Sequence, residues 1–304
     1  MSRNTHKDNC FYVECACLFD RHIFVNSGFI SDLAEYIVAL WYSYYLLDEY
    51  LNALNVIISI WGNIYDDDQL KPDYSFLNSY DLASLSNNAG VLLFLIGDYK
   101  HSLSMFNDAA NLINDMPITF HIGEVLFNLS LVSLLIDDHK NAQYYIDEAL
   151  EIVENFQSRS MEILGARYKV LKAYILVNIG AICDAKAIIK PSLDYLRQEI
   201  VENHEYIMEA HFVFALIFLH NSELASAQRC AMSAYNIAKR IRTPMRTRAR
   251  ISQLLGEILF YLPDYVESRR FLYHACSQAR YFSEEIVDWM YKAREECSKK
   301  IEFE

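Results

Sequence analysis

Residues 87–110, NNAGVLLFLIGDYKHSLSMFNDAA, form a unit that the rest of the chain repeats. Gly90 is a small residue within an apolar stretch, where a second helix can approach closely. Gly97 and Asp98 predict a tight turn, because glycine accepts positive φ and aspartate can bond to the neighbouring backbone. Small or apolar residues then follow at spacings of three and four, at Tyr99, Ser102, Phe106 and Ala109. The stretch therefore predicts a helix, a turn and a second helix.

Small residues recur along the chain at the position that Ser102 holds in this unit. They lie at 53, 102, 142, 185, 227 and 268, separated by 49, 40, 43, 42 and 41 residues. One hairpin of helices cannot bury its own apolar face, whereas stacked copies bury a continuous core. The period therefore predicts an all-α repeat protein, with about thirteen helices from residue 33 onward and essentially no strand.

The pattern small-Gly-x-x-Leu followed by Gly-Asp-Tyr-x-x-small-x-x-x-Phe-x-x-Ala resembles the tetratricopeptide repeat. The usual repeat has about 34 residues, so the copies here are lengthened and resemble those of bacterial peptide-sensing regulators. The resemblance implies a right-handed α-α superhelix, a solenoid of about six helical hairpins. It covers residues 33–281, between an N-terminal arm or cap at 1–32 and a C-terminal capping helix at 282–304.

The resemblance also implies a binding surface, because the first helices of such repeats line a concave groove. Carried over position by position, the groove candidates are Asn88, Asn128, Arg167, Tyr174, Asn178, Glu209, Phe212, His220, Arg250, Gln253 and Glu257. Asn88 and Asn128 occupy the same site in successive repeats. An asparagine side chain donates and accepts at once, which suits the holding of peptide backbone amides. The alternative is that these residues satisfy neighbouring helix ends or face water.

The segment 239–250, KRIRTPMRTRAR, is strongly basic and contains no acidic residue. Its six basic residues are Lys239, Arg240, Arg242, Arg246, Arg248 and Arg250. The first two are expected to close a helix, where cations are favoured. Arg246 and Arg250, four residues apart, are expected to share an exposed face of the next helix. The segment predicts a patch that docks an acidic partner or nucleic acid, or that joins copies of this chain, with a merely solvated face as the alternative.

Composition limits the class of protein. The chain of 304 residues has a net charge of −13, so nucleic acid is not an expected partner. No apolar run reaches the roughly 18 residues of a membrane span, and the N-terminus lacks the apolar core of a secretory signal. Seven cysteines without regular spacing fit a reducing compartment, which favours a cytoplasmic protein. The cysteines and histidine near the N-terminus match no common zinc-finger spacing: Cys10, Cys15, Cys17 and His22.

Catalytic signals in the sequence are poor. The pair His204 and Glu205 lacks the second histidine of the zinc-protease pattern H-E-x-x-H. Glu205, Glu209 and His211 lie close in sequence, and surface polarity is the simpler interpretation. We therefore expect no enzyme, no cofactor and no metal. The functional prediction is a noncatalytic scaffold that binds a peptide or protein segment in the groove. The alternative is a regulatory protein that controls transcription or signalling through a bound peptide or partner protein.

Overall fold

The computed structural model describes residues 49–65, 79–113, 120–202, 204–241, 243, 245–278 and 284–303. Every regular element within these ranges is an α-helix, and none is a strand. None of these helices is long and apolar enough to cross a membrane. The chain divides into two compact units, with a boundary between Asn155 and Phe156, and each unit is considered by itself.

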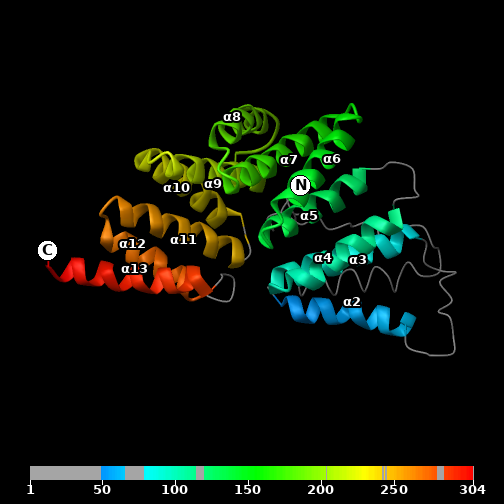
Figure 1. The fold of residues 1–304 in the computed structure, drawn as a ribbon, viewed down its shortest axis with the longest axis horizontal. Helices are drawn as coiled ribbons and strands as arrows, with labels where there is room; N and C mark the ends of the chain where they lie inside the picture. The colour runs from blue at the N-terminus through cyan, green and yellow to red at the C-terminus, as the bar shows by residue number, and fades with distance from the viewer. Residues whose placement is uncertain are drawn as a thin grey trace, which may run out of the picture. The chain divides into compact units, whose positions relative to one another are not determined.

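The N-terminal unit consists of successive helices that pack in chain order (Figure 1). They are α2 (Tyr50–Tyr65), α3 (Ser79–Ile96), α4 (Tyr99–Ile113), α5 (Phe120–Leu135) and α6 (His139–Glu154). The closest pairs are α3 with α4 and α5 with α6, which are two of the predicted hairpins. Helix α2 is the second helix of the first predicted hairpin, and the expected first helix lies outside the described residues.

The C-terminal unit continues the same arrangement with three more hairpins and a last helix. It contains α7 (Arg159–Asn178), α8 (Ile182–Glu199), α9 (Glu205–His220), α10 (Leu224–Arg240), α11 (Met245–Tyr261), α12 (Tyr265–Cys276) and α13 (Glu284–Phe303). The pairs are α7 with α8, α9 with α10 and α11 with α12, and α13 packs on α12. The first helices of neighbouring pairs also touch, α7 with α9 and α9 with α11. Helix α8 continues through Pro191 as one element.

A small residue of each first helix corresponds to a small residue of the second helix twelve residues later. Three of these pairs share a hydrogen bond of 2.7 Å from a serine hydroxyl to a backbone carbonyl: Ser102 to Gly90, Ser130 to Ala142 and Ser268 to Gly256. The other two pairs have buried alanines, Ala173 with Ala185 and Ala215 with Ala227. A Cβ on Gly90 would lie 2.7 Å from Phe106, and one on Gly256 would lie 2.6 Å from Leu272. The helices are therefore too close for larger residues there.

The five turns between paired helices share one pattern of backbone hydrogen bonds. Four of them contain a residue with positive φ: Gly97 (97°), Asp137 (62°), Gly180 (82°) and Ser222 (59°). The next N–H group donates to the carbonyl five residues earlier, for example from Asp98 to Leu93 at 2.9 Å and from Ala181 to Leu176 at 2.8 Å. This is the helix ending of the Schellman motif, which satisfies carbonyls that the helix leaves without partners. The predicted turn at Gly97 and Asp98 is confirmed.

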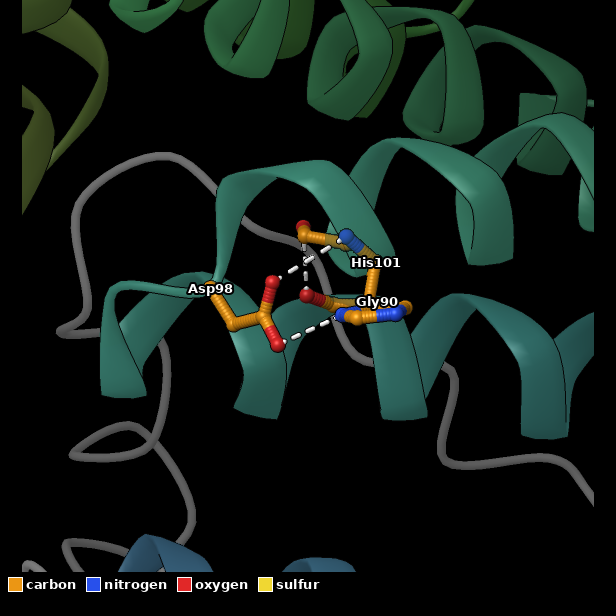
Figure 2. Close-up of polar contacts among 4 residues, drawn as sticks. Gly90, Asp98 and His101 are labelled. Atoms are coloured by element: carbon orange, nitrogen blue, oxygen red, sulfur yellow. Dashed lines mark hydrogen bonds and ion pairs between the residues drawn. The ribbon is translucent and has the colours of Figure 1, made fainter.

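Aspartates begin three of the second helices. Asp98 accepts a hydrogen bond from the backbone N–H of His101 at 3.2 Å, and its other oxygen lies 2.7 Å from the His101 Nδ1 atom (Figure 2). Asp138 and Asp264 cap α6 and α12 in the same way, through N–H groups three residues later. Such side chains satisfy donors that the first turn of a helix leaves unbonded. The turn residues of the sequence therefore end one helix and start the next.

The six small residues that defined the period are all fully buried: Ala53, Ser102, Ala142, Ala185, Ala227 and Ser268. They lie on second helices, as predicted. The all-α fold of stacked helical hairpins is confirmed in the part of the chain that the structure describes.

Helix α13 has the register of the first helix of a further repeat. Cys297 follows Gly256 by 41 residues, is fully buried, and places its Sγ atom 3.5 Å from the Ser268 Oγ atom. Met290 and Ala293 of the same helix join a buried apolar cluster with α12. The last helix therefore packs on the solenoid as an ordinary first helix would.

The opposite side of α13 is charged where α11 is apolar. Three buried residues of α11, Ile251, Leu255 and Leu259, correspond after 41 residues to the exposed Lys292, Glu296 and Lys300. Terminal repeats need a polar outer face to keep a solenoid soluble. The charged side of α13 agrees with the predicted capping helix, and the role of α13 as a cap stays a prediction.

Candidate functional site

The candidate site is the surface that α7, α9 and α11 share in the C-terminal unit, here called the first-helix face. These three helices touch in order, α7 with α9 and α9 with α11. On each helix the predicted residues have the spacing of one helical side. They are Arg167, Tyr174 and Asn178 on α7, Glu209, Phe212 and His220 on α9, and Arg250, Gln253 and Glu257 on α11. The structure therefore brings the candidates of this unit onto neighbouring helices.

A buried ion pair joins α7 to α9 at this face. Arg167 donates from Nε to one Glu209 oxygen at 3.1 Å and from Nη2 to the other at 3.0 Å. Its side chain is only 1% exposed, and its guanidinium carbon lies 4.5 Å from the centre of the Tyr206 ring. Burial lowers the pKa of Arg167, but the Glu209 carboxylate raises it, and the net pKa lies above its ordinary value. Arg167 therefore stays charged and holds two repeats together.

The start of α9 lies beside this pair. The Nδ1 atom of His204 accepts a hydrogen bond from the backbone N–H group of Tyr206 at 3.2 Å, and the centres of the two rings are 4.5 Å apart. Burial and the nearby Arg167 lower the pKa of His204 to about 4, so it is neutral at pH 7. Glu205 and His211 are buried, so their interpretation as surface polarity is wrong. The sequence pattern does not reveal the burial of Glu205 and His211, because α9 buries residues on several of its sides.

Aromatic side chains occupy the middle of the first-helix face. The rings of Tyr174 and Phe212 meet edge to face, with centres 6.2 Å apart. Both residues are half-buried against the core, so each keeps part of its ring accessible. Asn178 is exposed one turn beyond Tyr174, and its Nδ2 atom donates to the Tyr174 carbonyl at 2.8 Å. This part of the surface offers apolar contact area beside an amide oxygen.

Helix α11 adds polar groups. The Gln253 Nε2 atom donates to a Glu257 oxygen at 2.9 Å, and both side chains are partly buried. Burial raises the pKa of the Glu257 carboxyl above its ordinary value, although the hydrogen bond from Gln253 opposes part of this rise. Arg250 is also partly buried, and His220 is exposed at the end of α9. The face therefore combines aromatic, amide and carboxylate groups from three helices.

Asn88 and Asn128 lie in the N-terminal unit and are fully buried. The Asn128 Nδ2 atom on α5 donates to the Asn87 Oδ1 atom on α3 at 2.8 Å. For Asn128, the alternative that it satisfies a neighbouring helix thus has a definite contact. Contact of these two asparagines with a partner stays a prediction.

The basic segment is divided between surface and interior. Three of its residues are exposed, Lys239, Arg240 and Arg248, and the first two end α10 as predicted. Arg246 is only 4% exposed, so the prediction that it shares an exposed face with Arg250 is wrong. A spacing of four places two residues on one side of a helix but does not tell which side is buried. Arg242 lies outside the described residues.

Metal-binding side chains do not gather within the described ranges. No group of three or more His, Cys, Asp or Glu residues could hold a metal ion there. The N-terminal set with Cys10 and His22 lies outside those ranges. The arrangement on the first-helix face is suited to contact and hydrogen bonding.

No family model and no curated protein sequence matches the chain. Solved structures do match. A Rap protein complexed with Competence and Sporulation Factor has 12% identity and a TM-score of 0.60, over 90% of this chain and 87% of that one. A Rap conjugation gene regulator of a plasmid, in complex with a Phr peptide, has 15% identity and a TM-score of 0.57, over 82% and 76%.

Aspartyl phosphate phosphatase F from Bacillus subtilis is similar as well, with 12% identity and a TM-score of 0.52, over 93% of this chain and 86% of that one. At these identities the likeness is one of fold. It agrees with the paired helices, the shared turns and the period of the sequence. The chain has a tetratricopeptide-like repeat fold.

Proposed function

We propose that the chain is a noncatalytic scaffold that binds a peptide or a segment of a protein on its first-helix face. One observation carries the proposal. The half-buried pair of Tyr174 and Phe212 and the polar pair of Gln253 and Glu257 lie on neighbouring helices of one face. Aromatic rings supply contact area, and amide groups pair with a peptide backbone. The two pairs together suit a ligand with apolar side chains on a polar backbone.

The buried ion pair gives this surface its rigidity. Arg167 and Glu209 fix α7 against α9 without exposing the guanidinium. Tyr174 and Phe212 lie on the same two helices, one to two turns further along. A surface that is already ordered loses less conformational entropy when it binds. Buried residues would then position the helices, while the accessible ones contact the ligand.

The comparisons support a second candidate, a regulator that acts through a bound peptide. Two proteins of similar fold are Rap proteins, one complexed with Competence and Sporulation Factor and the other, a conjugation gene regulator, with a Phr peptide. A third is named as a phosphatase, whereas the described residues of this chain include no site to which we assign catalysis. A regulator would use the first-helix face for its signal and another surface for its target.

Selection of peptides on the intact chain tests the proposal. Short linear peptides are selected from a random phage-displayed library, and the best binder is measured by fluorescence anisotropy. Tyr174→Ala and Gln253→Ala should each weaken binding by about tenfold or more, as truncation at the centre of an interface does. Tyr144→Ala, at an exposed tyrosine of α6, is the matched control and should change nothing. Equal affinities for all variants, with unchanged melting curves, would contradict the proposed site.

A further inference from the structure

An arginine of α13 lies over two exposed tyrosine rings at the C-terminal end of the chain. The guanidinium carbon of Arg294 is 6.0 Å from the centre of the Tyr273 ring on α12 and 5.1 Å from that of Tyr291 on α13. The tyrosines are 64% and 45% exposed. Helices α12 and α13 lie side by side (Figure 1). A cation over an aromatic face is attracted by the ring, which holds Arg294 in place.

The outer side of α12 extends this surface. Val266, Arg269 and Tyr273 are spaced by three and four residues, so they lie along one side of the helix. Val266 is 56% exposed, although it is apolar, and Arg269 is exposed too. Together with Tyr291 and Arg294 these residues are here called the Tyr–Arg surface. It combines three exposed apolar or aromatic side chains with two guanidinium groups.

Within the described residues, neither of the two guanidinium groups forms an ion pair with an acidic side chain. Each lies near a buried thiol, Arg269 near Cys297 and Arg294 near Cys276. Burial raises the pKa of both thiols, and the two arginines oppose that rise. The adjacent Arg270, in contrast, pairs with Glu267 at 2.8 Å. Positive charge therefore remains available on a protein whose net charge is −13. Carboxylate groups of another molecule could therefore form ion pairs with the two arginines.

We propose that the Tyr–Arg surface docks an acidic segment of another protein. Its carboxylates pair with Arg269 and Arg294, since a guanidinium binds a carboxylate through two parallel hydrogen bonds. Its apolar side chains cover Val266, Tyr273 and Tyr291. Tyrosine and arginine are enriched at the centres of protein interfaces, whereas lysine and glutamate are depleted. Nucleic acid fits less well, because the phosphate backbone is repelled by the acidic chain.

This surface lies on other helices than the first-helix face and is independent of the proposed function. The probe is a fluorescein-labelled peptide in which pairs of glutamates alternate with single leucines. A second peptide carries glutamine in place of glutamate. The intact chain should bind the glutamate peptide at least about tenfold more tightly than the glutamine peptide, and less tightly as salt shortens the Debye length from about 10 Å at 0.1 M to about 3 Å at 1 M.

Variants distinguish this surface from general charge attraction. The double variant Arg269→Gln/Arg294→Gln should lose at least about tenfold in affinity for the glutamate peptide, which corresponds to about 1.4 kcal/mol. Lys190→Gln/Arg229→Gln removes two exposed cations of α8 and α10 and is the matched control. Tyr273→Ser tests the aromatic part without changing charge. Melting curves by circular dichroism confirm that each variant is folded.

Four results of the binding experiments overturn the proposal. They are absence of binding to the glutamate peptide, equal loss in the control variant, binding retained by the double variant, and preference for a single-stranded oligothymidine over the peptide. Sedimentation velocity of the chain alone examines a further occupant. Self-association that the double variant abolishes would assign the surface to contacts between copies of this chain, and would overturn the proposed partner.

Discussion

Arg167 on α7 and Glu209 on α9 form two hydrogen bonds of 3.1 and 3.0 Å across one repeat of 42 residues. The arginine is almost completely buried, and the glutamate keeps a small exposed part. A buried charge is costly to remove from water unless its partner remains in place. The pair therefore makes the packing of the two repeats dependent on both residues.

Single substitutions in this pair should have unequal costs. Glu209→Ala leaves the guanidinium buried without its carboxylate, and it should lower the free energy of unfolding by about 3–5 kcal/mol. Arg167→Met fills the same space with an apolar side chain and should cost less, because the Glu209 carboxylate that remains keeps an exposed part through which water can solvate it. Urea denaturation measures both values. Equal costs would show that lost packing, rather than the isolated charge, determines the result.

The turns offer a test of backbone strain without steric change. Gly180 has φ of 82°, and a Cβ added there would meet no atom within 4 Å. Gly180→Ala should therefore destabilise the protein by about 1 kcal/mol through the left-handed backbone alone. Ser222 has φ of 59° in the equivalent turn, so Ser222→Gly should not destabilise it. Thermal melting compares the two, and a loss of stability in Ser222→Gly would contradict the argument.

The repeat architecture could be predicted because its main contacts are local. Ser102 and Gly90, or Ser268 and Gly256, are twelve residues apart, so both members of each contact fall within one repeat of the sequence. The turn at Gly97 needs only its own backbone conformation. Such features return with every copy, and the period makes them visible.

The polar residues of the candidate site were harder to place, because their surroundings come from other repeats. Arg246 has the sequence pattern of a surface cation but is buried, as are Glu205 and His211. Asn128 was predicted to face a ligand, and it bonds to Asn87, 41 residues away. Periodicity identifies which residues share a side of a helix. It does not tell whether a polar side chain on that side meets a partner or a neighbouring helix.

A double-mutant cycle can measure the bond between the two asparagines. Asn128→Ala leaves the buried Asn87 amide without this donor and should cost about 1–3 kcal/mol of stability. The double variant Asn87→Ala/Asn128→Ala should cost less than the sum of the single variants, because the two residues interact. Chemical denaturation provides the values. An Asn128→Ala variant that keeps its stability but loses peptide binding would instead support a direct role in the site.

Stability should fall at mildly acidic pH because of a buried histidine. His211 on α9 lies 3.2 Å from an Arg197 nitrogen, and burial, with help from that arginine, lowers its pKa to about 4. The unfolded chain has a pKa near 6.5 at this residue, so protons favour unfolding as pH falls from about 6.5 toward 4. The contribution of neutral His211 to the free energy of unfolding is therefore complete above about pH 6.5 and is lost as the pH falls from there toward 4.

Substitution of His211 separates this effect from other titrations. His211→Gln cannot take up a proton, so the melting temperature of the variant should decline less between pH 6.5 and 4.5 than that of the wild type. Substitution of His220, which is exposed on the same helix, is the control and should leave the decline unchanged. If the melting temperatures of all three proteins decline in parallel with pH, protonation of His211 does not contribute to the loss of stability, and the side chain is not buried in solution.

The charged side of α13 should prevent self-association of the chain through this end of the solenoid. The triple variant Lys292→Ile/Glu296→Leu/Lys300→Leu restores the apolar residues that α11 carries at Ile251, Leu255 and Leu259. An exposed apolar surface of this kind favours association. Sedimentation velocity should therefore show more self-association in this variant than in the wild type, rising with concentration.

A second triple variant with serine at the same three positions removes the charges without adding apolar area. It should sediment as the wild type does, because the neutral polar side chains still favour water over a protein contact. Self-association of the serine variant would mean that charge repulsion, rather than the lack of apolar area, protects this end. If neither variant differs from the wild type, another part of the chain covers this side of α13, and the helix is not a cap.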